Sequence, residues 1–187
     1  MPGINVLQWI FCLLGSAGIV FISRHSLLQP RSHGFYRFFA WEILLGMFLL
    51  NADGWFHDPL AWHQLVSWAL LIISLGLVFE GLRLLREIGK QGAVRQDASL
   101  LELEKTSQLV TVGLYRYIRH PMYSSLMFLG WGIFFKSPSW PDAGLALLCS
   151  LFLIATARIE EHENINFFGA EYVEYMRHSK MFIPFVF

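Results

Sequence analysis

A histidine–proline motif is the strongest candidate for a functional site in this sequence. It reads GLYRYIRHPMY over residues 113–123 and leads directly into an apolar stretch. Pro121 suits the first turn of a helix, where its missing N–H group breaks no hydrogen bond. His120 would then lie at the helix start, where free backbone N–H groups and the helix dipole favour an anion such as a carboxylate. Tyr123 would project from roughly the same face. The alternative is a belt of polar side chains at a membrane surface.

A second polar cluster begins at Arg158 and reads RIEEHEN. On a helix, Glu160 shares a face with Glu163 and Asn164, whereas Arg158 can pair with Glu161. Carboxylates grouped in this way could bind a substrate ammonium group. The alternative is an exposed, charged helix end with local ion pairs.

Two other groups of polar residues are weaker candidates. Glu42 lies inside an apolar stretch, where a carboxylate needs a partner, a proton or a water-filled cavity, so functional and structural roles are both open. His57, Asp58 and His63 could be drawn as a metal site, but they lie in a loop without a supporting pattern. We therefore expect no metal ion.

The composition indicates what must position these residues. Of the 187 residues, 55% are hydrophobic and 15% are charged. This apolar share exceeds the roughly 45–50% of ordinary soluble domains, and the apolar residues fall in long runs. The 14 basic and 14 acidic residues balance, which gives no reason to propose a nucleic-acid partner. The sequence predicts an all-α, polytopic membrane helix bundle.

Five apolar segments define the predicted transmembrane helices. They are residues 6–22, 35–50, 65–82, 123–135 and 143–157. The last two are shorter than the ~17–25 residues of a straight span, so they extend into their polar flanks or form a hairpin that crosses incompletely. The sequence KSPSWP between them contains two prolines, which cannot continue a helix.

The basic residues predict the orientation in the membrane. Every Lys and Arg except Lys136 lies around the first loop, around the third loop or in the C-terminal tail. Because cytoplasmic loops are enriched in Lys and Arg, the N-terminus is predicted outside and the C-terminus in the cytoplasm. We expect one membrane domain over residues 1–187. Residues 1–82 would form three spans, and residues 83–187 a cytoplasmic segment, a helical hairpin and a tail that build the cofactor site.

Three pieces of sequence together resemble a known family. The stretch LVTVGLYRYIRHPMY, the acidic pair Glu160-Glu161, and FFGAEYVEYM followed by IPF are similar to the isoprenylcysteine carboxyl methyltransferases and related membrane phospholipid methyltransferases. The resemblance covers about residues 109–184. It implies an integral membrane enzyme that binds S-adenosylmethionine at its cytoplasmic face and takes its acceptor from the lipid.

The resemblance also implies roles for individual residues. The residues expected to contact the nucleoside of the cofactor are Leu109, Val110 and Tyr115. Those expected to contact its methionyl part are His120, Pro121, Met122 and Tyr123. Glu160 would bind its amino group, which agrees with the affinity of a carboxylate for an ammonium group.

Three positions depart from the family pattern. Thr156 stands where the family has an arginine implicated in acceptor binding, and Arg158 lies about 200° further round an ideal helix. Leu100 corresponds to a glutamine that contacts the cofactor, and Ser107 to a histidine. The acceptor classes that remain open are an isoprenylcysteine-like carboxylate, a phospholipid amine and a small thiol.

The expected reaction is direct methyl transfer to a lipophilic acceptor that enters from the bilayer. Such a transfer depends on approach, desolvation and orientation. Tyr123 and Glu160 would orient the donor, and Arg158 or Arg119 would hold an anionic acceptor. Two alternatives are an NADPH-dependent enzyme similar to the sterol reductases, which carry an RHPxY-like segment, and a non-catalytic membrane protein that retains the fold.

Overall fold

The computed structural model describes residues 6–90 and 105–186. Its helices are α1 (Val6–Leu27), α2 (His33–Leu50), α3 (Trp62–Ile88), α4 (Pro121–Phe134), α5 (Trp140–Phe168) and α6 (Ala170–His178), with short 3₁₀ turns at η1 (Ala52–Gly54) and η2 (Gly113–Arg116). The described residues form no strand, and an isolated bridge joins Ile118 to Lys180. The predicted all-α fold class is therefore confirmed.

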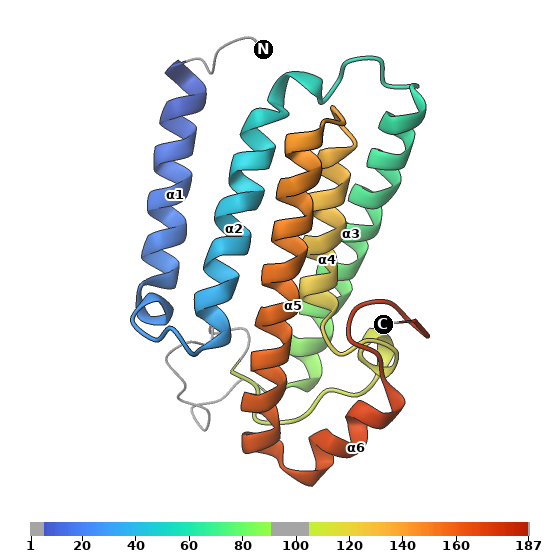
Figure 1. Cartoon of the computed structure of the whole chain (residues 1–187). Coiled ribbons are helices and arrows are strands. Elements are labelled where there is room, and N and C mark those ends of the chain that lie inside the picture. Colours follow the sequence, from blue (N-terminus) through green and yellow to red (C-terminus); the bar gives the residue numbers. More distant parts are fainter. Residues whose placement is uncertain (1–5, 91–104, 187) are drawn as a thin grey trace.

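Five helices run side by side as a bundle, and α6 lies across one end of it (Figure 1). Helix α2 packs between α1 and α5, and α4 packs between α5 and α3. Helix α1 packs mainly against α2 and leaves most of its apolar side chains exposed. A helix that exposes apolar side chains in this way suits a lipid environment rather than water.

Three of the helices are long and apolar enough to cross a membrane, namely α1, α3 and α5. Helix α2 has 18 residues but carries Arg37 and Glu42. Helix α4 has 14 residues, which corresponds to about 21 Å against a hydrocarbon core of about 30 Å. The membrane class is thus supported, whereas the count of five complete spans remains a prediction.

The fifth helix extends well beyond its apolar segment. Helix α5 continues for eleven residues past Ala157, through the whole RIEEHEN cluster, to Phe168. Gly169, with a φ of 62°, is its C-cap. The expected extension of the fifth segment into its polar flank is therefore observed, whereas how completely the α4–α5 hairpin crosses the membrane remains a prediction. This extension carries Glu160 and Glu161 out of the apolar bundle toward α6.

A polar contact connects the two N-terminal helices. The Ser16 hydroxyl donates to the Glu42 carboxylate and lies 3.0 Å from both oxygens. At Gly15, an added Cβ would lie 2.9 Å from a methyl carbon of Leu45, so the small residue permits the close approach of α1 and α2. Glu42 thus has the partner that a carboxylate in an apolar segment requires, which supports its structural role.

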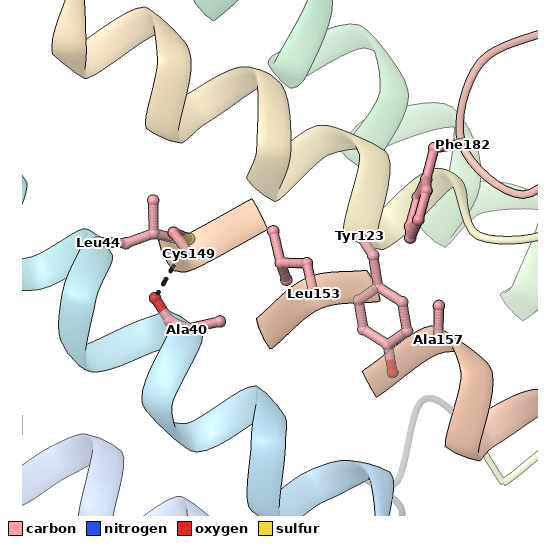
Figure 2. Packing of buried hydrophobic residues seen from close by; sticks show 7 residues of the cluster. All are labelled: Ala40, Leu44, Tyr123, Cys149, Leu153, Ala157 and Phe182. Carbon is pink, nitrogen blue, oxygen red and sulfur yellow. Dashed lines mark hydrogen bonds between the residues drawn. The ribbon is translucent and has the colours of Figure 1, made fainter. Parts of the chain in front are cut away.

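The apolar core lies where α2, α4 and α5 meet. Its buried members are Ala40 and Leu44 of α2, Tyr123 of α4, Cys149, Leu153 and Ala157 of α5, and Phe182 of the C-terminal tail (Figure 2). The Cys149 thiol lies 3.7 Å from the backbone carbonyl of Ala40. Tyr123 therefore belongs both to the core and to the histidine–proline motif, so packing fixes the motif against the bundle.

The other end of the bundle contains a buried lysine. Lys136, in the turn between α4 and α5, is 1% exposed. Its Nζ lies 3.4 Å from the centroid of the Trp68 ring and 5.1 Å from that of Trp55, and donates to Gln64 Oε1 at 3.1 Å. Burial lowers the pKa of Lys136. The lysine connects the turn to α3 and to the loop after α2.

Candidate functional site

The histidine–proline motif begins a helix as predicted. Pro121 is the first residue of α4 and His120 is its N-cap, with the His120 carbonyl accepting the backbone N–H of Ser124 at 2.9 Å. Pro121 packs against α3, where a Cβ added to Gly81 would lie 3.5 Å from Pro121 Cγ. The motif therefore enters the bundle between α3 and the core.

The C-terminal tail pairs with the backbone of the motif. The N–H of Arg119 donates to the Lys180 carbonyl at 2.7 Å, and that of His120 donates to the Met181 carbonyl at 3.1 Å. The Ser124 hydroxyl also donates to the Phe182 carbonyl at 2.9 Å. These bonds hold the backbone of His120, the residue before Pro121, at φ −122° and ψ 60°. The tail thereby sets the position of His120.

Arg119 and Glu161 form a buried ion pair beside the motif. Arg119 Nε lies 2.6 Å from Glu161 Oε1, and the two side chains are 9% and 7% exposed. The same guanidinium donates to the backbone carbonyls of Ser179 and Met176. The expected local pair between Arg158 and Glu161 is therefore replaced by a long-range pair, because the motif loop brings Arg119 against α5.

His120 lies between the two carboxylates of the acidic pair. Its Nδ1 is 3.7 Å from Glu160 Oε2, and its Nε2 is 3.4 Å from Glu161 Oε1. The imidazole stacks on the Tyr123 ring, with centroids 5.5 Å apart and planes at 18°. Glu161 is already bound to Arg119, whereas Glu160 is 18% exposed. Glu160 is therefore the more accessible carboxylate of the pair.

These residues line a pocket of about 630 Å³ between the motif, α5 and α6. Its lining residues are Leu85, Thr106, Leu109, Val110, Tyr115, Arg119, His120, Met122, Tyr123, Glu160, Asn164, Phe168, Tyr172 and Tyr175. The pocket thus brings together every residue predicted to bind the cofactor except Pro121, which packs behind it. Arg119 also lines the pocket, whereas Arg158 lies on an exposed face of α5 and does not.

The three departures from the family pattern have different surroundings. Thr156 is fully buried, and its hydroxyl donates to the Phe152 carbonyl at 2.7 Å. Ser107 is exposed, and its hydroxyl donates to the Lys90 carbonyl at 2.7 Å. Leu100 lies outside the described residues. The Thr156 side chain is therefore used within its own helix.

The aromatic residues of α6 form a wall of the pocket that the sequence analysis missed. Tyr172 stacks on Phe168 at 6.4 Å and meets Tyr175 edge to face at 5.7 Å. The Tyr175 hydroxyl donates to the Tyr115 carbonyl at 2.6 Å, which joins α6 to η2. The spacing of the two tyrosines within EYVEYM places them on one face of a helix. This spacing could have predicted an aromatic face on the helix. It could not have predicted that this face lines the pocket beside Tyr115.

An apolar groove of about 670 Å³ lies close to the pocket. Its lining residues are Val66 and Leu70 of α3, Ser124, Met127, Phe128, Trp131 and Phe135 of or next to α4, and Phe182 and Ile183 of the tail. Phe182 packs beside the His120 ring, with centroids 6.1 Å apart. His120 lines the pocket and Phe182 lines the groove, so two neighbouring side chains line the two cavities.

The remaining polar candidates lie elsewhere. His57 and Asp58 form an exposed pair at 3.1 Å, and His63 Nδ1 lies 3.0 Å from the Phe135 carbonyl. Across residues 6–90 and 105–186, no three His, Cys, Asp or Glu side chains are grouped closely enough to hold a metal ion. Glu163 turns away from the pocket and accepts from the N–H of His33, with His33 Nδ1 2.6 Å from its second oxygen.

Comparison with known proteins agrees with the geometry of the site. The profile of the phospholipid methyltransferase family matches residues 62–171, which include the motif and the acidic pair. Protein-S-isoprenylcysteine O-methyltransferase B of Arabidopsis thaliana is 30% identical over 154 residues, or 79% of this chain and 74% of that protein. Methanethiol S-methyltransferase of Crocosphaera subtropica is 30% identical over 79 residues, or 41% of this chain and 29% of that protein. No solved structure matches the chain. The protein therefore belongs to the phospholipid methyltransferase family and is a membrane methyltransferase.

Proposed function

We propose that this protein transfers a methyl group from S-adenosylmethionine to a lipophilic acceptor drawn from the bilayer. The observation that carries the proposal is that His120, in a pocket with charged side chains, packs beside Phe182, in an apolar groove. A charged, water-soluble donor suits the pocket, and a hydrocarbon chain suits the groove. The reacting groups would then meet beside Tyr123.

The lining of the pocket fits the donor part by part. The Glu160 carboxylate suits the donor's ammonium group, and the backbone N–H groups at the start of α4 suit its carboxylate. Leu109, Val110 and Tyr115 offer apolar and aromatic surface for the nucleoside. His120 and Tyr123, stacked on each other, would orient the methionyl chain between these ends.

The groove fits the hydrocarbon part of the acceptor. Its lining is apolar apart from Ser124, and it lies between α4 and α3, of which α3 exposes many apolar side chains. Each methylene that a lipid buries contributes about 0.8 kcal/mol, and the membrane concentrates the acceptor before it binds. The chemical class of its reacting group remains one of three: a carboxylate, a phospholipid amine or a small thiol.

Five spans with the N-terminus outside are part of the proposal. This topology would place the pocket, α6 and most basic residues in the cytoplasm, where the donor is available. Helices α2 and α4 would then cross as members of the bundle rather than as independently stable spans. The short α4 would expose its N-terminal end to the interface.

The residues of the pocket would orient the reaction rather than carry protons. The donor supplies a methyl group activated by a positively charged sulfur, which leaves with the electron pair as a neutral thioether. A carboxylate or thiolate attacks without a base, whereas an amine must lose a proton afterwards. Arg119 and Arg158 remain the candidate cations for an anionic acceptor. Of the two, Arg119 lines the pocket and is already bound to Glu161.

The test is methylation of a lipid extract by the purified protein in liposomes, with radiolabelled S-adenosylmethionine. We expect label in a lipid-soluble product that mass spectrometry can identify, and an apparent KM that follows the mole fraction of acceptor in the bilayer. In Glu160→Gln, loss of a charge-assisted contact of roughly 1.5–3 kcal/mol should weaken donor binding about 10- to 150-fold.

The control is Glu163→Gln, because Glu163 lies on the same helix turn but contacts His33 outside the pocket. Equal donor affinity in Glu160→Gln and the wild type would remove Glu160 from the site. Binding of NADPH but not of S-adenosylmethionine would overturn methyl transfer. Activity that follows only the aqueous concentration of a polar acceptor would overturn access from the bilayer.

A further inference from the structure

A buried hydroxyl in the pocket has no hydrogen-bond partner among the described residues. Tyr172 of α6 is 2% exposed and lines the pocket. Within the part of the chain that the structure describes, its hydroxyl makes no hydrogen bond. Asn164 is a polar neighbour on α5, but the geometry between the two side chains is not that of a hydrogen bond. Buried hydroxyl groups in proteins are nearly always paired, so one that lines a pocket calls for a ligand atom.

The surroundings of Tyr172 determine what kind of ligand atom it can bind. Burial, and the negative charge of Glu160, raise the pKa of Tyr172 well above its ordinary value. The hydroxyl therefore stays protonated and acts as a neutral hydrogen-bond donor. A ligand oxygen with a lone pair is the natural partner, because the nearby carboxylate already offers an acceptor for positive groups.

The position of Tyr172 indicates which part of the donor it reaches. On one side it is close enough to Glu160, the proposed site of the amino group, for that charge to affect its pKa. On the other side it packs against Tyr175, whose hydroxyl is bound to Tyr115 at the proposed nucleoside end. The ribose is the part of S-adenosylmethionine that connects these two ends, and its hydroxyl oxygens are neutral acceptors.

We infer that Tyr172 is a donor-binding residue whose hydroxyl donates a hydrogen bond to a ribose hydroxyl of S-adenosylmethionine. The inference rests on the proposed function and extends it to α6. It assigns the EYVEYM segment to recognition of the donor, in addition to closing the pocket.

A matched pair of variants separates this role from a structural one. Tyr172→Phe removes a hydroxyl that makes no hydrogen bond within residues 6–90 and 105–186, so the protein without ligand should keep its thermal midpoint or gain slightly. Tyr175→Phe removes a hydroxyl that donates to Tyr115, so its thermal midpoint should fall. Both changes leave the aromatic packing in place. A merely structural Tyr172 would behave like Tyr175.

The experiment is calorimetric titration of the full-length protein in detergent with S-adenosylhomocysteine and with three analogues. The analogues are 5′-methylthioadenosine, which keeps the ribose but lacks the amino-acid end, and the 2′-deoxy and 3′-deoxy forms of S-adenosylhomocysteine. We expect Tyr172→Phe to weaken binding of the parent compound and of methylthioadenosine roughly 3- to 10-fold. With one of the two deoxy forms, the variant should bind as well as the wild type.

Each other outcome overturns the inference at a defined point. Equal affinity of the variant and the wild type for the parent compound removes Tyr172 from the site while the proposed function stands. A loss that disappears with methylthioadenosine assigns Tyr172 to the amino-acid end, and a loss that persists with both deoxy forms assigns it to the base. If the wild type binds none of these compounds, the proposed function fails with the inference.

Discussion

Two buried basic residues lie at opposite ends of the bundle, and they are neutralised differently. Arg119, at the end covered by α6, is bound to a carboxylate and two backbone carbonyls. Lys136, in the turn between α4 and α5, is held by an amide oxygen and the faces of two tryptophans. At the α6 end, Glu161 pairs with Arg119 and a second carboxylate, Glu160, is left over. At the other end, the groups that contact Lys136 are all neutral.

The two polar clusters differ in whether their polar groups are used within the fold or remain accessible to a ligand. At the Lys136 end, Gln64 also donates to the carbonyls of Gly54 and Lys136. Both the nitrogen and the oxygen of its amide are therefore hydrogen-bonded within the fold. At the α6 end, Glu160 remains partly exposed beside a pocket, and the Tyr172 hydroxyl has no partner among the described residues. The partly exposed carboxylate beside a pocket therefore distinguishes the α6 end as the place where a ligand would bind.

The largest effect is expected in a test of whether the two ends of the bundle lie on opposite sides of the membrane. We expect single cysteines at Leu60, beyond the Lys136 end, and at Ser107, near the pocket, to react with an impermeant reagent from opposite sides. Both positions are exposed. The measurement is labelling of intact cells against permeabilised cells, in a background where Cys12 and Cys149 are replaced. Labelling of both from the same side would contradict the proposed topology.

Removal of Arg119 should have the largest energetic effect. Arg119→Ala would leave Glu161 buried without its cation, which costs roughly 3–5 kcal/mol of folding free energy. It would also free the tail carbonyls and displace His120, so donor affinity of the folded fraction should fall. Thermal unfolding and donor titration together check this. Arg119→Lys is the control, because it keeps the charge but lacks the planar fork.

Removal of Lys136 should affect stability alone. Lys136→Ala loses the bond to Gln64 and the stacking on Trp68, which together are worth about 2–3 kcal/mol. Methyl transfer per folded molecule should not change, because the turn between α4 and α5, which contains the lysine, lies at the end of the bundle opposite α6 (Figure 1). A loss of donor affinity in protein that keeps its fold would show that the two ends are coupled.

The smallest effect is expected for Arg158. Its side chain lies on an exposed face of α5 outside the pocket, so Arg158→Ala should change donor affinity by less than about twofold. The informative measurement is the KM for the acceptor. A raised KM for an anionic acceptor only would support the predicted role of Arg158 in holding it, whereas an unchanged KM for every acceptor would assign no such role.

Local sequence signals predicted the parts of the fold that depend on local chemistry. Pro121 begins α4 because proline fits the first turn of a helix, and the prolines of KSPSWP coincide with the turn before α5. Hydropathy placed α1 and α3 well but ended the fifth segment at Ala157, because a continued helix of polar residues gives no apolar signal.

The parts that local signals could not predict depend on contacts between distant residues. Glu161 had a candidate partner three residues away in Arg158, but the fold brings Arg119 to it from another element. Lys136 was set apart from the other basic residues only by its loop, and its burial, which the sequence did not predict, requires tryptophans from two other segments. Asn164 and Tyr172 line the same pocket because α6 lies across the end of the bundle and contacts α5. Contacts of this kind can be identified only from the tertiary structure.

The pairing between the tail and the histidine–proline motif has a consequence for the order of folding. It joins residues that are 60 positions apart in the case of Arg119 and Ser179, so it closes a long loop that contains the whole α4–α5 hairpin. Such contacts form after local ones, because the chain must first lose the entropy of that loop. The pocket should therefore be completed late, and it should also open first when the native protein fluctuates. Bound donor would close this local opening, and slower hydrogen exchange at the amides of Arg119 and His120 would follow from its binding.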